Sequence, residues 1–129
     1  MFINDYRVLI VDDNPTFVKT LSVLIRAILG ERLKTLDVAG NGFDAIEKAF
    51  GEEVYDVIFM DVDMPGMDGL SATRVIKRRL FRATRVVAIS FHKDLDTIRE
   101  MVLSGAELYI SKDNLTIESL ERTFDLRLS

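Results

Sequence analysis

The segment from Tyr55 to Gly69, with the sequence YDVIFMDVDMPGMDG, constrains the fold of this chain more than any other. Its apolar run at 57–60 is rich in β-forming residues and predicts a buried strand that ends at Asp61. One proline and two glycines at 65–69 then indicate a loop. An acid at the carboxyl end of a buried strand lies where open α/β sheets bind their ligands. Asp61 is therefore a candidate site residue, provided that other residues converge on it.

The composition is that of one globular domain, with 129 residues of which 48% are hydrophobic and 29% charged. A net charge of −4 gives no basic footprint for nucleic acid or for an anionic membrane. The absence of cysteine excludes disulfides and thiolate sites. No segment has the pattern of a signal peptide or approaches the ~18 apolar residues of a membrane span. We therefore expect a cytoplasmic protein that binds neither membranes nor, directly, nucleic acid.

Segments with the composition of strands alternate with segments of helical periodicity. The predicted strands are 7–11, 35–38, 57–60, 85–90 and 108–111. The predicted helices begin at Asn14, at Asn41, at Asp68, at Asp94 or Asp96, and at Thr116, and the last helix extends to Leu128. The third helix has a basic tail, which suits a helix C-terminus and is interpreted as solvated surface: Lys77, Arg78 and Arg79.

This alternation predicts an α/β fold with a parallel sheet and right-handed crossovers. The doubly wound strand order 2-1-3-4-5 would bring Asp12 and Asp13, after the first strand, next to Asp61 on the third. A half-barrel or a nucleotide-binding order explains that convergence less directly, and no glycine-rich phosphate fingerprint follows the first strand. We therefore predict a doubly wound, flavodoxin-like (βα)5 three-layer sandwich.

Polar side chains follow four of the five predicted strands at their carboxyl ends: Asp12, Asp13, Asp61, Ser90 and Lys112. Three crowded carboxylates raise each other's pKa unless a cation compensates them. Mg²⁺ takes oxygen ligands and typically joins one or two carboxylates to a phosphate. Lys112 adds a positive charge suited to a phosphoryl oxygen, and Ser90 adds a neutral donor. The pattern indicates phosphoryl chemistry.

An aspartate can form a covalent acyl phosphate, for which positioning and charge neutralisation supply most of the catalysis. Asp61 is the predicted nucleophile, because Asp12 and Asp13 on the neighbouring strand are better placed to hold the ion. The backbone carbonyl of Asp63 would complete the metal shell from the loop.

The motifs RVLIVDDNP, VAGNGFDAIEKA, YDVIFMDVDMPGMDG, VVAIS and GAELYISKD together resemble the receiver domain of bacterial two-component response regulators. The resemblance covers nearly the whole chain, so we expect residues 1–129 to form one receiver domain without an effector domain. It implies a signalling module that acts only on its own phosphorylation and is not a turnover enzyme. The implied phosphodonor is a phosphohistidine on a sensor histidine kinase or on a histidine phosphotransfer protein, and the implied cofactor is Mg²⁺ or Mn²⁺.

The resemblance also implies roles for single residues. Asp61 stands at the phosphoacceptor position, Asp12 and Asp13 at the acidic metal positions, and Lys112 at the position of the family's lysine. Two further residues would form a switch. The hydroxyl of Ser90 would move towards the phosphoryl group, and the ring of Tyr109 would rotate inward.

The expected output of that switch is a changed surface on the fourth helix, fifth strand and fifth helix, which is also a candidate surface for a self-dimer.

The chain departs from the family pattern beside the predicted site. Phe91 stands where the family often has a small residue, and its ring would narrow access to Asp61. The resemblance also implies that His92 and Asp63 stand at positions which, in the family, tune the lifetime of the phosphate. Asp113 stands where the family commonly has a proline, and the peptide bond before that proline is commonly cis. A cis bond before a residue other than proline costs about 2.5 to 4 kcal/mol, so a trans bond is an alternative here.

Two other functions stay open at the level of sequence. One is an interaction domain of receiver fold with little or no phosphorylation. The other is a phosphatase of the haloacid dehalogenase type with Asp61 as nucleophile and Asp63 as acid, although that class carries its DxD pair on the first strand.

Overall fold

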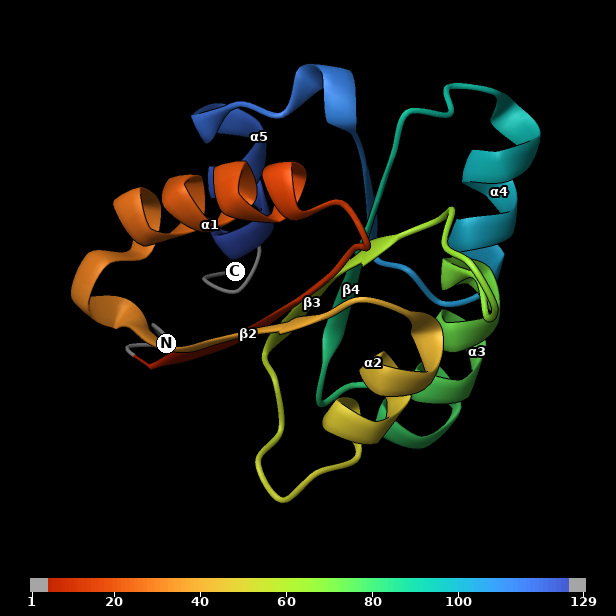
Figure 1. Ribbon diagram of the computed structural model, residues 1–129, viewed down its shortest axis with the longest axis horizontal. Helices are drawn as coiled ribbons and strands as arrows, with labels where there is room; N and C mark the ends of the chain where they lie inside the picture. Colours follow the sequence, from red (N-terminus) through yellow and green to blue (C-terminus); the bar gives the residue numbers. More distant parts are fainter. Residues whose placement is uncertain (1–4, 126–129) are drawn as a thin grey trace.

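The computed structural model describes residues 5–125, and within them five strands alternate with five α-helices (Figure 1). The strands are β1 (Tyr6–Val11), β2 (Leu33–Ala39), β3 (Val57–Asp61), β4 (Arg85–Ser90) and β5 (Leu108–Ser111). The α-helices are α1 (Pro15–Leu29), α2 (Gly42–Ala49), α3 (Gly69–Leu80), α4 (Leu95–Leu103) and α5 (Ile117–Asp125). Two short 3-10 turns, η1 (Gly30–Arg32) and η2 (Lys112–Asn114), were not predicted. The predicted end of the last helix at Leu128 lies outside the described residues.

The five strands form one parallel sheet in the order β2-β1-β3-β4-β5, which confirms the predicted doubly wound order. Val11, at the end of β1, pairs with Ala39 of β2 and with Met60 of β3. Since β1 and β3 are parallel and in register at this end, Asp12 and Asp61 leave the sheet side by side. The strand order therefore brings the two acids together.

Helices cover both faces of the sheet (Figure 1). Alternate side chains of the buried strands point to opposite faces, as strand geometry requires. Strand residues Val8, Ile10, Phe59 and Ile89 share a core cluster with Leu21 and Ile25 of α1 and with Leu120 and Phe124 of α5. Strand residues Leu9, Ile58, Met60 and Ala88 share the other cluster with Ala45 of α2, Ile76 of α3 and Met101 of α4. The result is the predicted three-layer sandwich.

Side-chain caps set the helix starts that position the site. The Oδ1 of Asn14 accepts hydrogen bonds from the backbone N–H groups of Thr16 and Phe17 at the start of α1. At α4 the cap is Asp94, whose carboxylate accepts from the N–H of Thr97, and this decides between Asp94 and Asp96. Within residues 5–125, no helix combines the length and the apolar character that crossing a bilayer requires.

The interpretation of Lys77 as solvated surface is wrong. Its side chain is only 6% exposed, and Nζ donates hydrogen bonds to the carbonyls of Phe81 and Thr84, both at 2.8 Å, and to Oε2 of Glu107 at 2.6 Å. Position 77 lies on the buried face of α3, and an ammonium can be buried when acceptors and an opposite charge surround it. Arg78 and Arg79 are exposed, as expected.

Candidate functional site

Three carboxylates meet at the carboxyl ends of β1 and β3. Asp12, Asp13 and Asp61 each offer an oxygen within 4.8 Å of those of the other two. Asp12 and Asp61 are buried, whereas Asp13 is exposed. The backbone N–H of Asn14 donates to Oδ1 of Asp12 at 2.9 Å, which fixes the Asp12 carboxylate as the chain turns into α1. An all-oxygen set with two buried acids fits a hard divalent cation of the size and charge of Mg²⁺.

Lys112 closes the cluster from the end of β5. Its Nζ lies 2.7 Å from Oδ2 of Asp12 and 3.4 Å from Oδ1 of Asp61, and its side chain is only 7% exposed. The lysine is the first residue of η2, directly after the edge strand. The structure therefore brings together four of the five residues that the sequence predicted to converge, all except Ser90.

The surroundings of Asp61 in this cluster change the pKa of its carboxyl group. Burial, and next to it the charge of Asp12, raise the pKa of Asp61 from 3.8 to about 6, although Lys112 opposes that rise. One lysine therefore does not fully compensate the crowded carboxylates. A bound cation would supply the missing positive charge.

A close backbone approach holds the loop after Asp61. The N–H of Gly69 donates to the carbonyl of Val62 at 3.0 Å, so the loop folds back onto the end of β3 before α3 begins. A Cβ atom at position 69 would lie 2.0 Å from the carbonyl oxygen of Asp61. Glycine permits this close approach because it has no Cβ atom.

Three of the other predicted residues, Ser90, Tyr109 and Asp63, each contact His92, and the sequence did not indicate these contacts. The Oγ of Ser90 accepts a hydrogen bond from the N–H of His92 at 3.0 Å, and the hydroxyl of Tyr109 donates to the carbonyl of His92 at 2.8 Å. Nε2 of His92 lies 2.6 Å from Oδ2 of Asp63. His92 therefore links the loop after β3 to the end of β4 and to Tyr109 of β5.

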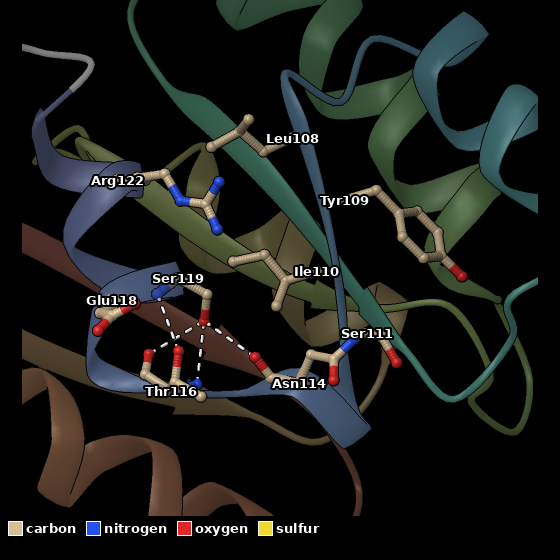
Figure 2. Close-up of a pocket in the computed structure, with 9 residues that line it drawn as sticks. All are labelled: Leu108, Tyr109, Ile110, Ser111, Asn114, Thr116, Glu118, Ser119 and Arg122. Carbon is tan, nitrogen blue, oxygen red and sulfur yellow. Dashed lines mark hydrogen bonds between the residues drawn. The ribbon is translucent and has the colours of Figure 1, made fainter.

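Ser90 and Tyr109 differ in their surroundings. Ser90 is buried at the end of β4, whereas Tyr109 is half-buried and projects to the side of β5 opposite to Ile110 (Figure 2). The inward rotation of Tyr109 and the ligand role of the Asp63 carbonyl stay predictions. The bond between Lys112 and Asp113 is trans, which is the alternative left open by the sequence.

The profile of the response regulator receiver domain matches residues 8–123. The chain belongs to this family. Among its relatives is the osmosensing histidine protein kinase SLN1 of Saccharomyces cerevisiae, which is 33% identical over 111 residues, covering 82% of this chain and 9% of the kinase. For eight of the curated relatives, the chain spans between 5% and 47% of the relative's length.

Solved structures share the receiver fold. The receiver domain of the sensor histidine kinase PA1611 from Pseudomonas aeruginosa, which holds a magnesium ion in its active site cleft, matches with a TM-score of 0.81 and 24% identity over 95% of this chain and 96% of that one. A second match is the co-crystal structure of the histidine phosphotransfer protein Ypd1 of Saccharomyces cerevisiae with the receiver domain of its response regulator Ssk1. The matched chain has a TM-score of 0.79 and 22% identity, over 96% of this chain and 89% of that one. Both comparisons show the fold.

Two aromatic rings border the lysine of this receiver domain. The ring centroid of Phe17 lies 4.4 Å from Nζ of Lys112, and that of Phe91 lies 5.4 Å from it. Phe91 was predicted beside the site, but Phe17 was missed. The signal was present in the sequence, because Phe17 lies three residues after the Asn14 cap and so in the first turn of the helix that follows the acid pair.

Proposed function

We propose that Asp61 is the phosphoacceptor of this receiver domain and that Asp12, Asp13 and Lys112 activate it. The observation that carries the proposal is the position of the Lys112 ammonium between the buried carboxylates of Asp12 and Asp61. That position suits a cation which holds the carboxylates before the reaction and binds a phosphoryl oxygen after it.

The proposed reaction is an in-line displacement at phosphorus. A carboxylate oxygen of Asp61 forms the new P–O bond, and the bond from phosphorus to the donor's imidazole nitrogen breaks, with the electron pair leaving on that nitrogen. The displaced imidazole takes a proton from solvent. Lys112 stabilises the charge on the transferred phosphoryl oxygens. The chain acts only on its own phosphorylation, and water later hydrolyses the acyl phosphate.

We propose Mg²⁺ as the cofactor, with Asp12, Asp13 and Asp61 as side-chain ligands and the backbone carbonyl of Asp63 as a further ligand. The cluster of three carboxylates and the raised pKa of Asp61 support a site that needs a cation. When bound, the ion would neutralise charge on the phosphoryl oxygens. Mn²⁺ takes the same oxygen ligands and is the expected substitute.

The proposed phosphodonor is a phosphohistidine on a sensor histidine kinase or on a histidine phosphotransfer protein. Membership in the receiver family supports this choice, as does the solved complex of Ypd1 with the receiver domain of Ssk1. We propose that the domain works in the cytoplasm, where such donors present their histidines.

The proposed output is the surface formed by α4, β5 and α5, which is also the surface proposed for self-association. Between β5 and α5 it contains a cavity of about 450 Å³ that is lined by Leu108, Ile110, Ser119 and Arg122 among others (Figure 2). Tyr109 joins this surface to the site, because its hydroxyl binds the carbonyl of His92 next to Ser90. A charge gained at Asp61 would thereby change the position of Tyr109.

The direct test is covalent labelling. We expect the protein incubated with Mg²⁺ and acetyl phosphate to gain one phosphoryl group, measured by intact mass. Asp61→Asn should gain none, while Asp44→Asn, a change to an exposed acid on α2, should label normally. An unlabelled wild-type protein, or equal labelling of Asp61→Asn, would refute the assignment and favour an interaction domain without phosphorylation. Repeated turnover of a phosphomonoester would instead favour the phosphatase alternative.

A further inference from the structure

We propose that Phe17 and Phe91 form an aromatic clamp that positions the ammonium of Lys112 for phosphoryl transfer. This inference rests on the proposed function, because it gives Phe17 and Phe91 a role in the same reaction. Both rings lie within the distance of about 6 Å at which a cation is attracted by an aromatic face. They are positioning residues that act through Lys112.

A flexible lysine needs such help. Its four-carbon stem can place the ammonium in many positions, and each rotamer that must be excluded costs conformational entropy. The carboxylates of Asp12 and Asp61 attract the ammonium, but both are also proposed metal ligands. Once a cation binds them, their hold on Lys112 weakens. The two aromatic rings are not ligands of the metal ion, so their attraction for the ammonium of Lys112 remains when the ion binds.

The two rings come from different elements, and each is placed independently. The N–H of Phe17 donates to the Asn14 cap, so the first turn of α1 fixes where Phe17 begins, and its ring packs against the core between α1 and the sheet. Phe91 directly follows Ser90 at the end of β4. Both rings and Lys112 line one surface cavity of about 300 Å³. The ammonium therefore has carboxylates and aromatic rings as its neighbours, and the lysine is only 7% exposed.

The exposure of Phe91 supports a role in the site. Its side chain is 62% exposed, so burial against the core does not explain a phenylalanine at this position. A contact between the ring of Phe91 and the ammonium of Lys112 would explain why a phenylalanine stands at this exposed position. Phe91 is therefore the better position for a test, because its replacement should leave the fold intact.

The first measurement needs no phosphorylation. We expect the Cε methylene protons of Lys112, observed by NMR and assigned by their loss in Lys112→Arg, to be shifted upfield by the two ring currents. Phe91→Leu and Phe17→Leu should each move them towards the value of a free lysine. Random-coil shifts in the wild-type protein, or shifts unchanged in both variants, would overturn the clamp.

The second measurement is the initial rate of labelling by acetyl phosphate with Mg²⁺. We expect Phe91→Leu, which keeps an apolar side chain but loses the ring, to be about two- to tenfold slower. Phe91→Trp should restore the rate, because indole binds cations at least as well as phenyl. The control is Phe81→Leu, which changes a phenylalanine of similar exposure after α3, away from the site, and should not alter the rate.

An equal or faster rate in Phe91→Leu would overturn the proposal and indicate instead that the ring restricts access to Asp61. A slow rate in both Phe91→Leu and Phe91→Trp would overturn it as well, because the aromatic face would then not be the property that matters. A wild-type protein that takes no phosphoryl group would refute the proposed function, and the chemical shifts would then decide the clamp on their own.

Discussion

Nζ of Lys112 lies 2.7 Å from Oδ2 of Asp12, closer than its 3.4 Å separation from Oδ1 of Asp61. The lysine therefore neutralises Asp12, which follows β1, more than Asp61, which ends β3. This asymmetry is consistent with the raised pKa of Asp61, because the charge of Lys112 offsets only part of the effect of burial and of Asp12 on that carboxyl group.

Removing the lysine charge should raise the pKa of Asp61 further. In Lys112→Met we expect that pKa to lie above about 6, because the one cation that opposes burial and Asp12 is lost. Carboxyl ¹³C NMR of metal-free protein measures it. Lys93→Met removes an exposed lysine that pairs with Asp113 and should leave the titration of Asp61 unchanged. The same titration in Lys112→Met and wild type would contradict the electrostatic role given to Lys112.

Asp61 should lower the stability of the metal-free protein at neutral pH. Its folded-state pKa of about 6 lies above the unfolded value of 3.8, so the folded state binds more protons between these values and stability falls as pH rises through that window. We expect Asp61→Asn to raise the free energy of unfolding at pH 7 by up to about 3 kcal/mol. Urea unfolding in EDTA measures the gain, which should shrink as pH falls below 6. A gain that is constant from pH 4 to pH 7 would contradict this account.

Mg²⁺ should stabilise the folded domain by mass action. At one hundred times its Kd the ion would add about 2.7 kcal/mol to the free energy of unfolding, provided that it binds only the folded state. Thermal unfolding with increasing Mg²⁺ should show a rising Tm that Asp12→Asn abolishes. Asp96→Asn, a change to an exposed acid in the first turn of α4, should keep the response. A Tm that does not respond to Mg²⁺ in the wild-type protein would speak against the metal site.

A side chain at position 69 should disturb the end of β3. In Gly69→Ala the new Cβ would meet the carbonyl of Asp61, so α3 must move away from the strand. We expect a loss of about 1 to 3 kcal/mol in stability and slower labelling of Asp61. Gly40→Ala serves as a control, because a Cβ at position 40 has open space. Equal stabilities of the two variants would show that the close approach is not required.

Gly105→Ala should destabilise the domain at the other end of the sheet. Gly105 has φ 113°, and a Cβ there would lie 2.8 Å from Cγ of Lys77, the buried lysine that binds Glu107. We expect a loss of about 1 to 3 kcal/mol, measured by urea unfolding, with little change in the labelling of Asp61. A labelling defect as large as that of Gly69→Ala would mean that this cluster is coupled to the site.

The sequence by itself determined the fold and the centre of the site. The aliphatic strands and capped helices predicted the alternation, and acids at the ends of the first and third strands selected the order 2-1-3-4-5. Asp12, Asp13, Asp61 and Lys112 converge because each lies within two residues of the carboxyl end of a strand in one parallel sheet, and that position can be recognised from the neighbouring sequence.

The tertiary structure decided which side chains contact one another across elements. The burial of Lys77, the contacts of Asp63 and Tyr109 with His92, and the ring of Phe17 near Lys112 each join segments that are distant in sequence. Helical periodicity placed Lys77 on a face of α3, but the residue that balances its buried charge, Glu107, lies just before β5, thirty residues further along the chain. Such pairings depend on how the elements pack, and packing is not encoded in any one segment.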